Sequence, residues 1–246
     1  MNNIPNTRKV SPSANTSNFD QELKILTNLH KNGQNGQNQN QKYIIGISGA
    51  SCSGKTTTAR KLINFFKKYE QATKIFVEKI SQDNYYKDFK TLPMNELTNF
   101  REFDEPECID FEKLYKDILK FKGSNQDGNQ DNKEGTQILL VEGNMITTNP
   151  KLLKLFNLTF FFDLSINSSI SRRKVREDED DDWIPEHPKV VELNVYPCYL
   201  KHREMTGENL RNLEEIQGEF LLIDGENSME VNFSTVLSEI CGFLAK

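Results

Sequence analysis

The sequence lacks several features that mark whole classes of protein. It contains no run approaching the ~18 apolar residues of a membrane span, and its first residues (MNNIPNTRKVSPSANTSNF) lack the apolar core of a secretory signal. The 31 Lys and Arg residues are outnumbered by 36 Asp and Glu residues, so the formal net charge is -5. A general nucleic-acid binder usually has a basic surplus. We therefore expect neither a membrane nor a nucleic acid as partner.

Cysteine and histidine are scarce and scattered. The four cysteines lie far apart and form no CxxC pair: Cys52, Cys108, Cys198 and Cys241. This spacing argues against a disulfide framework or a zinc site, and it favours a reducing, cytoplasmic setting. The three histidines, at positions 30, 187 and 202, have no metal-ligand spacing, and we expect them to be ordinary surface or packing residues.

Hydrophobic residues make up only 36% of the chain, so some stretch must be polar and without a core. Residues 1–42 are rich in Asn, Gln and Ser, and we expect a mostly disordered, dispensable tail in which FDQELKILTNL (19–29) forms a helical turn or two. Residues 123–136 (GSNQDGNQDNKEGT) read as a low-complexity surface-loop insertion. The remainder, 43–246, is predicted to be one domain.

Within that domain, apolar strand patterns alternate with helical ones. The predicted strands are YIIGIS (43–48), KIFVEKI (74–80), ILLVEG (138–143), LTFFFDL (158–164) and EFLLIDG (219–225). Near-continuous apolar runs are typical of strands buried on both faces of a parallel sheet. The spacing of Ala59, Leu62, Ile63 and Phe66 predicts a helix after the first strand, and Asp110 is a candidate N-cap for another. The fold class is therefore α/β, with a doubly wound five-stranded parallel sheet.

The strongest motif follows the first strand. Residues 49–56, GASCSGKT, match GxxxxGK[ST] in full, between a predicted strand and a predicted helix. The backbone of such a loop curls around phosphates at a helix N-terminus, Lys55 reaches the β- and γ-phosphates, and the Thr56 hydroxyl can bind Mg²⁺. The candidate ATP-binding residues here are Gly49, Ala50, Ser51, Cys52, Ser53, Gly54, Lys55, Thr56 and Thr57.

Carboxylates follow two other strands. Asp83 lies just beyond the second strand, where functional residues of open α/β sheets gather, and it can accept a proton from an acceptor hydroxyl and help to hold Mg²⁺. Glu142 ends the third strand and is a rival Mg²⁺ ligand through water. In NFREFDEP, Asp104 could bind the hydroxyls of a ribose and Phe103 could stack on a base.

Arginines cluster on the helix predicted after the fourth strand. Arg172 and Arg176 are i,i+4 neighbours on one face, and Arg173 is adjacent. A group of guanidinium side chains suits a small lid that closes on transferring phosphates.

Taken together, these segments resemble nicotinamide riboside kinases, members of the uridine kinase-like P-loop kinases. The matching stretches are YIIGISGASCSGKTTTARKL, ISQDNYYK, NFREFDEPECIDFEKL, ILLVEGNMI, FFDLSINSSISRRKVR, YPCYLKHREM and LLIDG, which together span about residues 43–225. The resemblance implies a P-loop kinase fold with a lid. It also implies ATP- and Mg²⁺-dependent phosphorylation of the 5′-hydroxyl of nicotinamide riboside, and of nicotinic acid riboside, in NAD synthesis.

Residue by residue, the resemblance assigns roles as follows. Asp83 is the proton acceptor and an Mg²⁺ ligand, Thr56 is the other Mg²⁺ ligand, and Lys55 is catalytic. Substrate contacts are implied for Asp83, Tyr86, Phe103, Asp104 and Arg173. ATP contacts beyond the phosphate loop are implied for Arg172, Arg176, Asp224 and Gly225.

Two other functions stay open at this point. A uridine or cytidine kinase would share NFREFDEPECIDF but would need hydrogen-bond partners for the edge of a pyrimidine base. A nucleotide-dependent switch would bind ATP or GTP without small-molecule turnover. A GTP switch usually carries an NKxD-type motif, which this chain lacks, and Asp83 and the arginines favour catalysis.

Overall fold

The protein is described by a computed structural model that covers residues 7–10, 19–33, 41–92, 94, 101–123, 134–175, 188–212, 216 and 218–246. Most of the expected 123–136 insertion, Arg176, the acidic residues after it and His187 lie outside these described residues.

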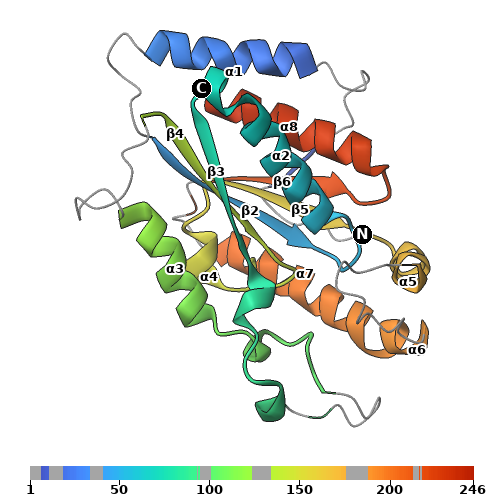
Figure 1. Cartoon of the computed structure of the whole chain (residues 1–246). Coiled ribbons are helices and arrows are strands. Elements are labelled where there is room, and N and C mark those ends of the chain that lie inside the picture. The colour runs from blue at the N-terminus through green and yellow to red at the C-terminus, as the bar shows by residue number, and fades with distance from the viewer. Residues whose placement is uncertain are drawn as a thin grey trace.

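The centre of the fold is one parallel sheet (Figure 1). Its strands are β1 (Arg8–Lys9), β2 (Lys42–Gly49), β3 (Ile75–Ser81), β4 (Thr136–Glu142), β5 (Leu158–Asp163) and β6 (Glu219–Asp224). Their order in the sheet is β1-β6-β5-β2-β4-β3, and every pairing is parallel. The chain leaves β2 toward one edge and later crosses to the other side at β5. The carboxyl end of β2 is therefore the switch point where ligands bind in open α/β sheets.

Helices cover both faces of the sheet. They are α1 (Phe19–Gly33), α2 (Lys55–Thr73), α3 (Phe111–Gly123), α4 (Pro150–Leu153), α5 (Ile166–Lys174), α6 (Pro188–Val190), α7 (Tyr196–Asn212) and α8 (Met229–Leu244). The 3₁₀ segments η1 (Gln82–Tyr85), η2 (Phe89–Thr91) and η3 (Pro106–Cys108) and the π-turn η4 (Val191–Val195) complete the elements. Helices α1, α2 and α8 lie on one face, and α3, α4 and α7 on the other (Figure 1).

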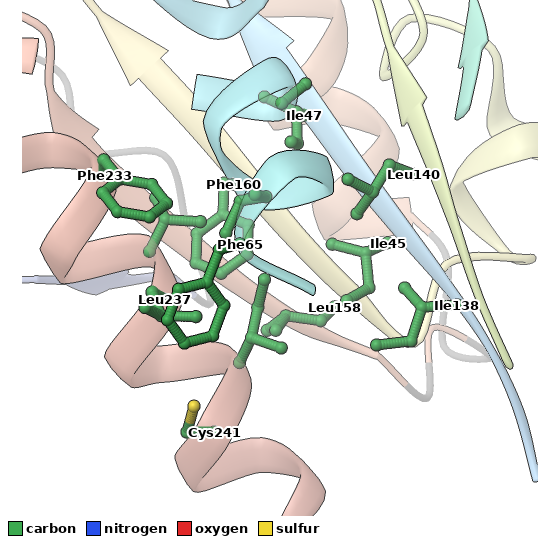
Figure 2. Close-up of a cluster of buried hydrophobic side chains, with 14 of the residues drawn as sticks. Ile45, Ile47, Phe65, Ile138, Leu140, Leu158, Phe160, Phe233, Leu237 and Cys241 are labelled. Atoms are coloured by element: carbon green, nitrogen blue, oxygen red, sulfur yellow. The ribbon is translucent and has the colours of Figure 1, made fainter. Parts of the chain in front are cut away.

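Alternation along the strands explains why the strand segments are apolar throughout. Ile45 and Ile47 of β2 join the core under α2 and α8, whereas Ile44 joins the core on the opposite face. Figure 2 shows the first of these cores, with Phe160 of β5 packed near Phe233 of α8. Successive side chains of a strand point to opposite faces, so a strand covered on both sides must be apolar at every position.

Two segments of the expected disordered tail, residues 7–10 and 19–33, are ordered in the structure. Residues 8 and 9 pair with β6 as a sixth strand, and the N–H of Val10 donates to the Leu222 carbonyl at 3.1 Å. Residues 19–33 form a four-turn helix whose Leu26 is fully buried. The ring of Phe19 lies 5.8 Å from that of Phe233. The few apolar residues of this polar segment are enough to stabilise the helix because they pack against an apolar surface formed by α2 and α8.

Candidate active site

The phosphate loop leaves β2 in the strained geometry that its glycines allow. Gly49 has φ +123°, and a Cβ there would stand 2.1 Å from the Phe162 carbonyl oxygen, so only glycine fits between β2 and β5. Gly54 has φ +95° at the N-cap of α2. The helix begins at Lys55, so Thr56 and Thr57 lie in its first turn. The first N–H groups of a helix have no intrahelical partner, and their partial positive charge favours a phosphate here.

Three cationic side chains converge on this loop. The ammonium group of Lys55, which is 8% exposed, donates to the Ala50 carbonyl at 2.5 Å. Arg173 is buried and donates to the Ser51 hydroxyl at 2.6 Å. Arg172 donates to the carbonyls of Cys52 (3.3 Å) and Gly225 (2.8 Å). The predicted lid arginines 172 and 173 therefore contact the loop, with Arg172 joining it to the turn after β6.

Glu142 is held at the same edge of the sheet. Its carboxylate is 3% exposed and accepts hydrogen bonds from the hydroxyls of Thr56 (2.9 Å) and Ser81 (2.8 Å), while the Lys79 ammonium lies 3.5 Å away. Hard oxygen donors of this kind suit Mg²⁺, which usually takes one or two carboxylates together with substrate phosphates. Among the residues that the structure describes, no group of three or more His, Cys, Asp or Glu side chains could hold a metal alone. The donor set therefore fits an ion that is shared with a bound nucleotide.

The candidate acceptor side lies beyond β3. Asp83 is exposed in η1, directly after the strand, and Tyr86 follows it. The rings of Tyr86 and Phe103 meet edge to face, with centroids 5.8 Å apart. Burial raises the pKa of Tyr86, the carboxylates of Asp83 and Asp104 raise it further, and Arg173 lowers it. Phe103 thus contacts the Tyr86 ring, and Asp83, Asp104 and Arg173 lie close enough to affect its pKa.

The turn after β6 is built around two acidic residues. Asp224 accepts a hydrogen bond from the Glu226 N–H at 3.0 Å, and Gly225 donates to the Asp163 carbonyl at 2.7 Å. Glu226 in turn binds Ser165 N–H at 3.0 Å and the Ser168 hydroxyl at 2.5 Å, at the start of α5. Burial would raise the pKa of Glu226, but these hydrogen bonds outweigh it and lower that pKa. The turn thereby anchors the helix that carries the arginines.

Several polar contacts around the site were not predicted from the sequence. Ser81 is one, and the pair Gln82–Asn144, joined by a 2.7 Å hydrogen bond, is another. The segment ISQD contains two of these residues, and its position at a strand end was the available signal. His202, expected to be a surface or packing residue, is buried in α7 with 2% of its surface exposed. The part of the chain that the structure describes contains no helix long and apolar enough to cross a membrane.

Comparison with known proteins agrees with this geometry. The chain is similar to nicotinamide riboside kinase 1 of Homo sapiens, with 27% identity over 208 residues that cover 83% of this chain and 94% of that protein. It is also similar to a uridine kinase of Clostridium botulinum (strain Okra / Type B1), with 29% identity over 147 residues that cover 54% of this chain and 68% of that one. The solved structure of the YGR205w protein shares the fold, with a TM-score of 0.51 and 18% identity, covering 84% of this chain and 94% of that chain.

A family model, that of the phosphoribulokinase/uridine kinase family, matches residues 44–181. This range is more than half of the 246 residues. It contains the phosphate loop, Asp83, Glu142, Arg172 and Arg173. The chain is a kinase of the phosphoribulokinase/uridine kinase family.

Proposed function

We propose that this kinase transfers the γ-phosphoryl group of ATP to the 5′-hydroxyl of nicotinamide riboside, and of nicotinic acid riboside, to form the mononucleotides used in NAD synthesis. The observation that carries the proposal is the acceptor side, where the Tyr86 and Phe103 rings are 5.8 Å apart and Asp83 and Asp104 both act on Tyr86. A pyridinium ring is positively charged, and it is attracted both by aromatic faces and by carboxylates.

The similarity to known kinases supports the same choice. The similarity to the human nicotinamide riboside kinase extends over 83% of this chain, whereas that to the clostridial uridine kinase covers 54%. The segment YPCYLKHREM, in α7, lies outside the family-model match at 44–181 and is part of the resemblance to nicotinamide riboside kinases.

In this account Asp83 takes the proton of the 5′-hydroxyl while the oxygen bonds to the γ-phosphorus. The bond from that phosphorus to the β,γ-bridging oxygen breaks, and ADP leaves. Lys55, Arg172 and Arg173 neutralise the charge of the phosphate oxygens. The Asp104 carboxylate accepts hydrogen bonds from the ribose hydroxyls. When bound, Mg²⁺ would supply further charge neutralisation, held by Thr56 and Asp83 with Glu142 reaching it through water.

A uridine or cytidine kinase is the second candidate, because the clostridial relative is named a uridine kinase. An ADP-release assay across nicotinamide riboside, nicotinic acid riboside, uridine and cytidine separates the two. We expect the highest kcat/KM with one of the pyridine ribosides. Higher kcat/KM for a pyrimidine nucleoside would replace the first proposal with the second.

A further inference from the structure

One face of α7 lies against residues 102–105, the segment that contains Phe103 and Asp104. The Lys201 ammonium binds the Glu105 carboxylate at 2.6 Å, and the Cys198 thiol lies 3.9 Å from the other oxygen of that carboxylate. The imidazole of His202 is buried beside the backbone of Asp104, and its Nε2 has no hydrogen-bond partner among the described residues. Positions 198, 201 and 202 are spaced i, i+3 and i+4, which places them on one side of a helix. Helix α7 therefore packs against residues 102–105, which are called the acceptor segment below.

One turn later, the same helix is tied to the phosphate loop. The Thr206 hydroxyl donates to the His202 carbonyl at 2.8 Å and lies 2.9 Å from the Thr147 hydroxyl, which is 3.1 Å from the hydroxyl of Ser48. All three hydroxyl-bearing residues are fully buried. Each hydroxyl has a single proton. Because Thr206 gives its proton to the His202 carbonyl, Thr147 is the donor to Thr206. Ser48 then donates to Thr147 and shares its proton with the Asn144 carbonyl, which lies 3.4 Å away.

Ser48 is the residue immediately before Gly49, where the phosphate loop begins. A second connection reinforces this end of the helix, since the Asn209 amide donates to the carbonyls of Thr147 (3.2 Å) and Thr148 (2.9 Å). Residues 202 and 206 are one helical turn apart, a separation of about 6 Å along a rigid element. One short helical segment thus contacts the donor side at one end and the acceptor side at the other.

We propose that α7 is a spacer that sets the distance between the phosphate loop and the acceptor segment, with His202 as its main positioning residue. The inference rests on the proposed function, because it takes residues 102–105 as the riboside side of the site. Reacting atoms must lie about 3–3.5 Å apart, so a small shift of this segment would weaken the binding of the riboside in its reactive position and reduce kcat/KM for the riboside, even if no catalytic residue changed.

The test compares His202→Phe, which keeps a ring but has no N–H donor, with His202→Gln, which keeps a donor. Losing this buried polar contact should raise KM for the riboside roughly three- to tenfold and leave KM for ATP within about twofold. His202→Gln should recover part of the loss. Lys201→Ala, at an exposed position, should raise the riboside KM by up to about fivefold, and it tests the same surface if the Phe variant does not fold.

Cys241→Ala is the matched control for stability, because Cys241 is buried in α8 on the opposite face of the sheet. It should lower the melting temperature without changing the ratio of the two KM values. An unchanged riboside KM in folded His202→Phe overturns the proposal. The proposal is also overturned if His202→Phe raises KM for the riboside and KM for ATP by the same factor, because the ratio of the two would then equal that of Cys241→Ala.

Amide hydrogen exchange gives a readout that does not depend on turnover. In His202→Phe the amides of residues 101–109 should exchange faster than in the unmodified protein, while those of β2 remain protected. If the unmodified protein phosphorylates no riboside, the proposed function fails but this measurement still tests the spacer. Unchanged exchange in 101–109 would show that α7 does not hold the segment.

Discussion

The hydroxyl of Thr56 donates a 2.9 Å hydrogen bond to the buried carboxylate of Glu142. Ser81 binds the other carboxylate oxygen, so Glu142 joins the first turn of α2 to the ends of β3 and β4. Two hydroxyl donors keep a nearly unexposed charge solvated within the protein. The edge of the sheet thereby presents an oriented anionic group beside the first turn of α2, where an Mg²⁺–ATP complex would bind in the proposed reaction.

Glu142→Gln should impair the use of Mg²⁺. The amide keeps the shape and one acceptor oxygen, but it removes the negative charge and leaves one hydroxyl without an acceptor. Groups that orient a metal ion from outside its direct ligands typically account for 10- to 100-fold in metal affinity or activity. Titrating Mg²⁺ at saturating ATP measures this as a shift of the half-maximal concentration or a lower kcat. Glu78→Gln, which removes an exposed carboxylate from the same region of the sheet, is the control, and equal behaviour of the two variants would contradict the role of Glu142.

Asp104→Ala should weaken the binding of the riboside and leave the binding of ATP nearly intact. A hydrogen bond between a carboxylate and a ribose hydroxyl is charge-assisted, and its loss costs about 1.5–3 kcal/mol, or roughly ten- to a hundredfold in KM. Steady-state kinetics with each substrate varied in turn provide the measurement. A rise of KM for ATP alone would exclude residues 102–105 from the riboside site.

Leu26→Ala should destabilise the whole domain. Leu26 is fully buried in the core shared by α1, α2 and α8. Replacing a buried Leu by Ala costs about 2–5 kcal/mol of unfolding free energy. Thermal unfolding should therefore shift downward by several degrees, whereas the exposed substitution Asn28→Ala should have little effect. If deletion of residues 1–40 left the melting temperature unchanged, α1 would not be part of the stable fold.

The stability of the protein should depend on pH through His202. Burial lowers the pKa of His202 to about 4. The Asp104 backbone and Glu107 oppose this shift, and Lys201 adds to it. The unfolded chain, with an ordinary pKa of about 6.5, binds the proton more readily between pH 6.5 and 4. The contribution is therefore complete above pH 6.5 and is lost as pH falls through this window, by about 2 kcal/mol between pH 7 and pH 5.

Denaturant unfolding at several pH values tests this expectation. His202→Gln has no group that titrates there, so its unfolding free energy should fall less steeply with acid than that of the unmodified protein. Other groups titrate in both proteins and cancel in the comparison. Parallel pH profiles would mean that His202 is not buried as a neutral side chain.

Hydrophobic periodicity and the position of the motifs were sufficient to predict the strands and the phosphate loop of the kinase core. The strand segments and the Asp110 cap before Phe111 were predicted, and Asp110 indeed accepts a hydrogen bond from the Lys113 N–H at 3.0 Å. The GASCSGKT loop lies between β2 and α2 as expected. Local patterns of this kind carry their own signal because strands covered on both faces and phosphate loops need particular residues at particular spacings.

Contacts between distant segments could not be predicted in this way. The helix at 19–33 is stable only because α2 and α8 receive its apolar side, and nothing within residues 1–42 reveals that surface. The burial of His202 beside the backbone of Asp104 likewise could not be predicted, because the two residues are about a hundred positions apart in the chain. Tertiary packing supplies the stability of such elements, so it has to be seen in the folded chain.

Identifying the phosphorylated product tests the central claim most directly. Mass spectrometry and NMR should show a 5′-mononucleotide of nicotinamide riboside formed from ATP by the unmodified protein. Asp83→Asn, which keeps the shape but not the basicity, should form it on the order of 10²- to 10⁴-fold more slowly. Lys55→Ala should also be strongly impaired while remaining folded. Normal product formation by Asp83→Asn together with an inactive Glu142→Gln would give the base role to Glu142, and absence of any riboside 5′-phosphate with the unmodified protein would contradict the account.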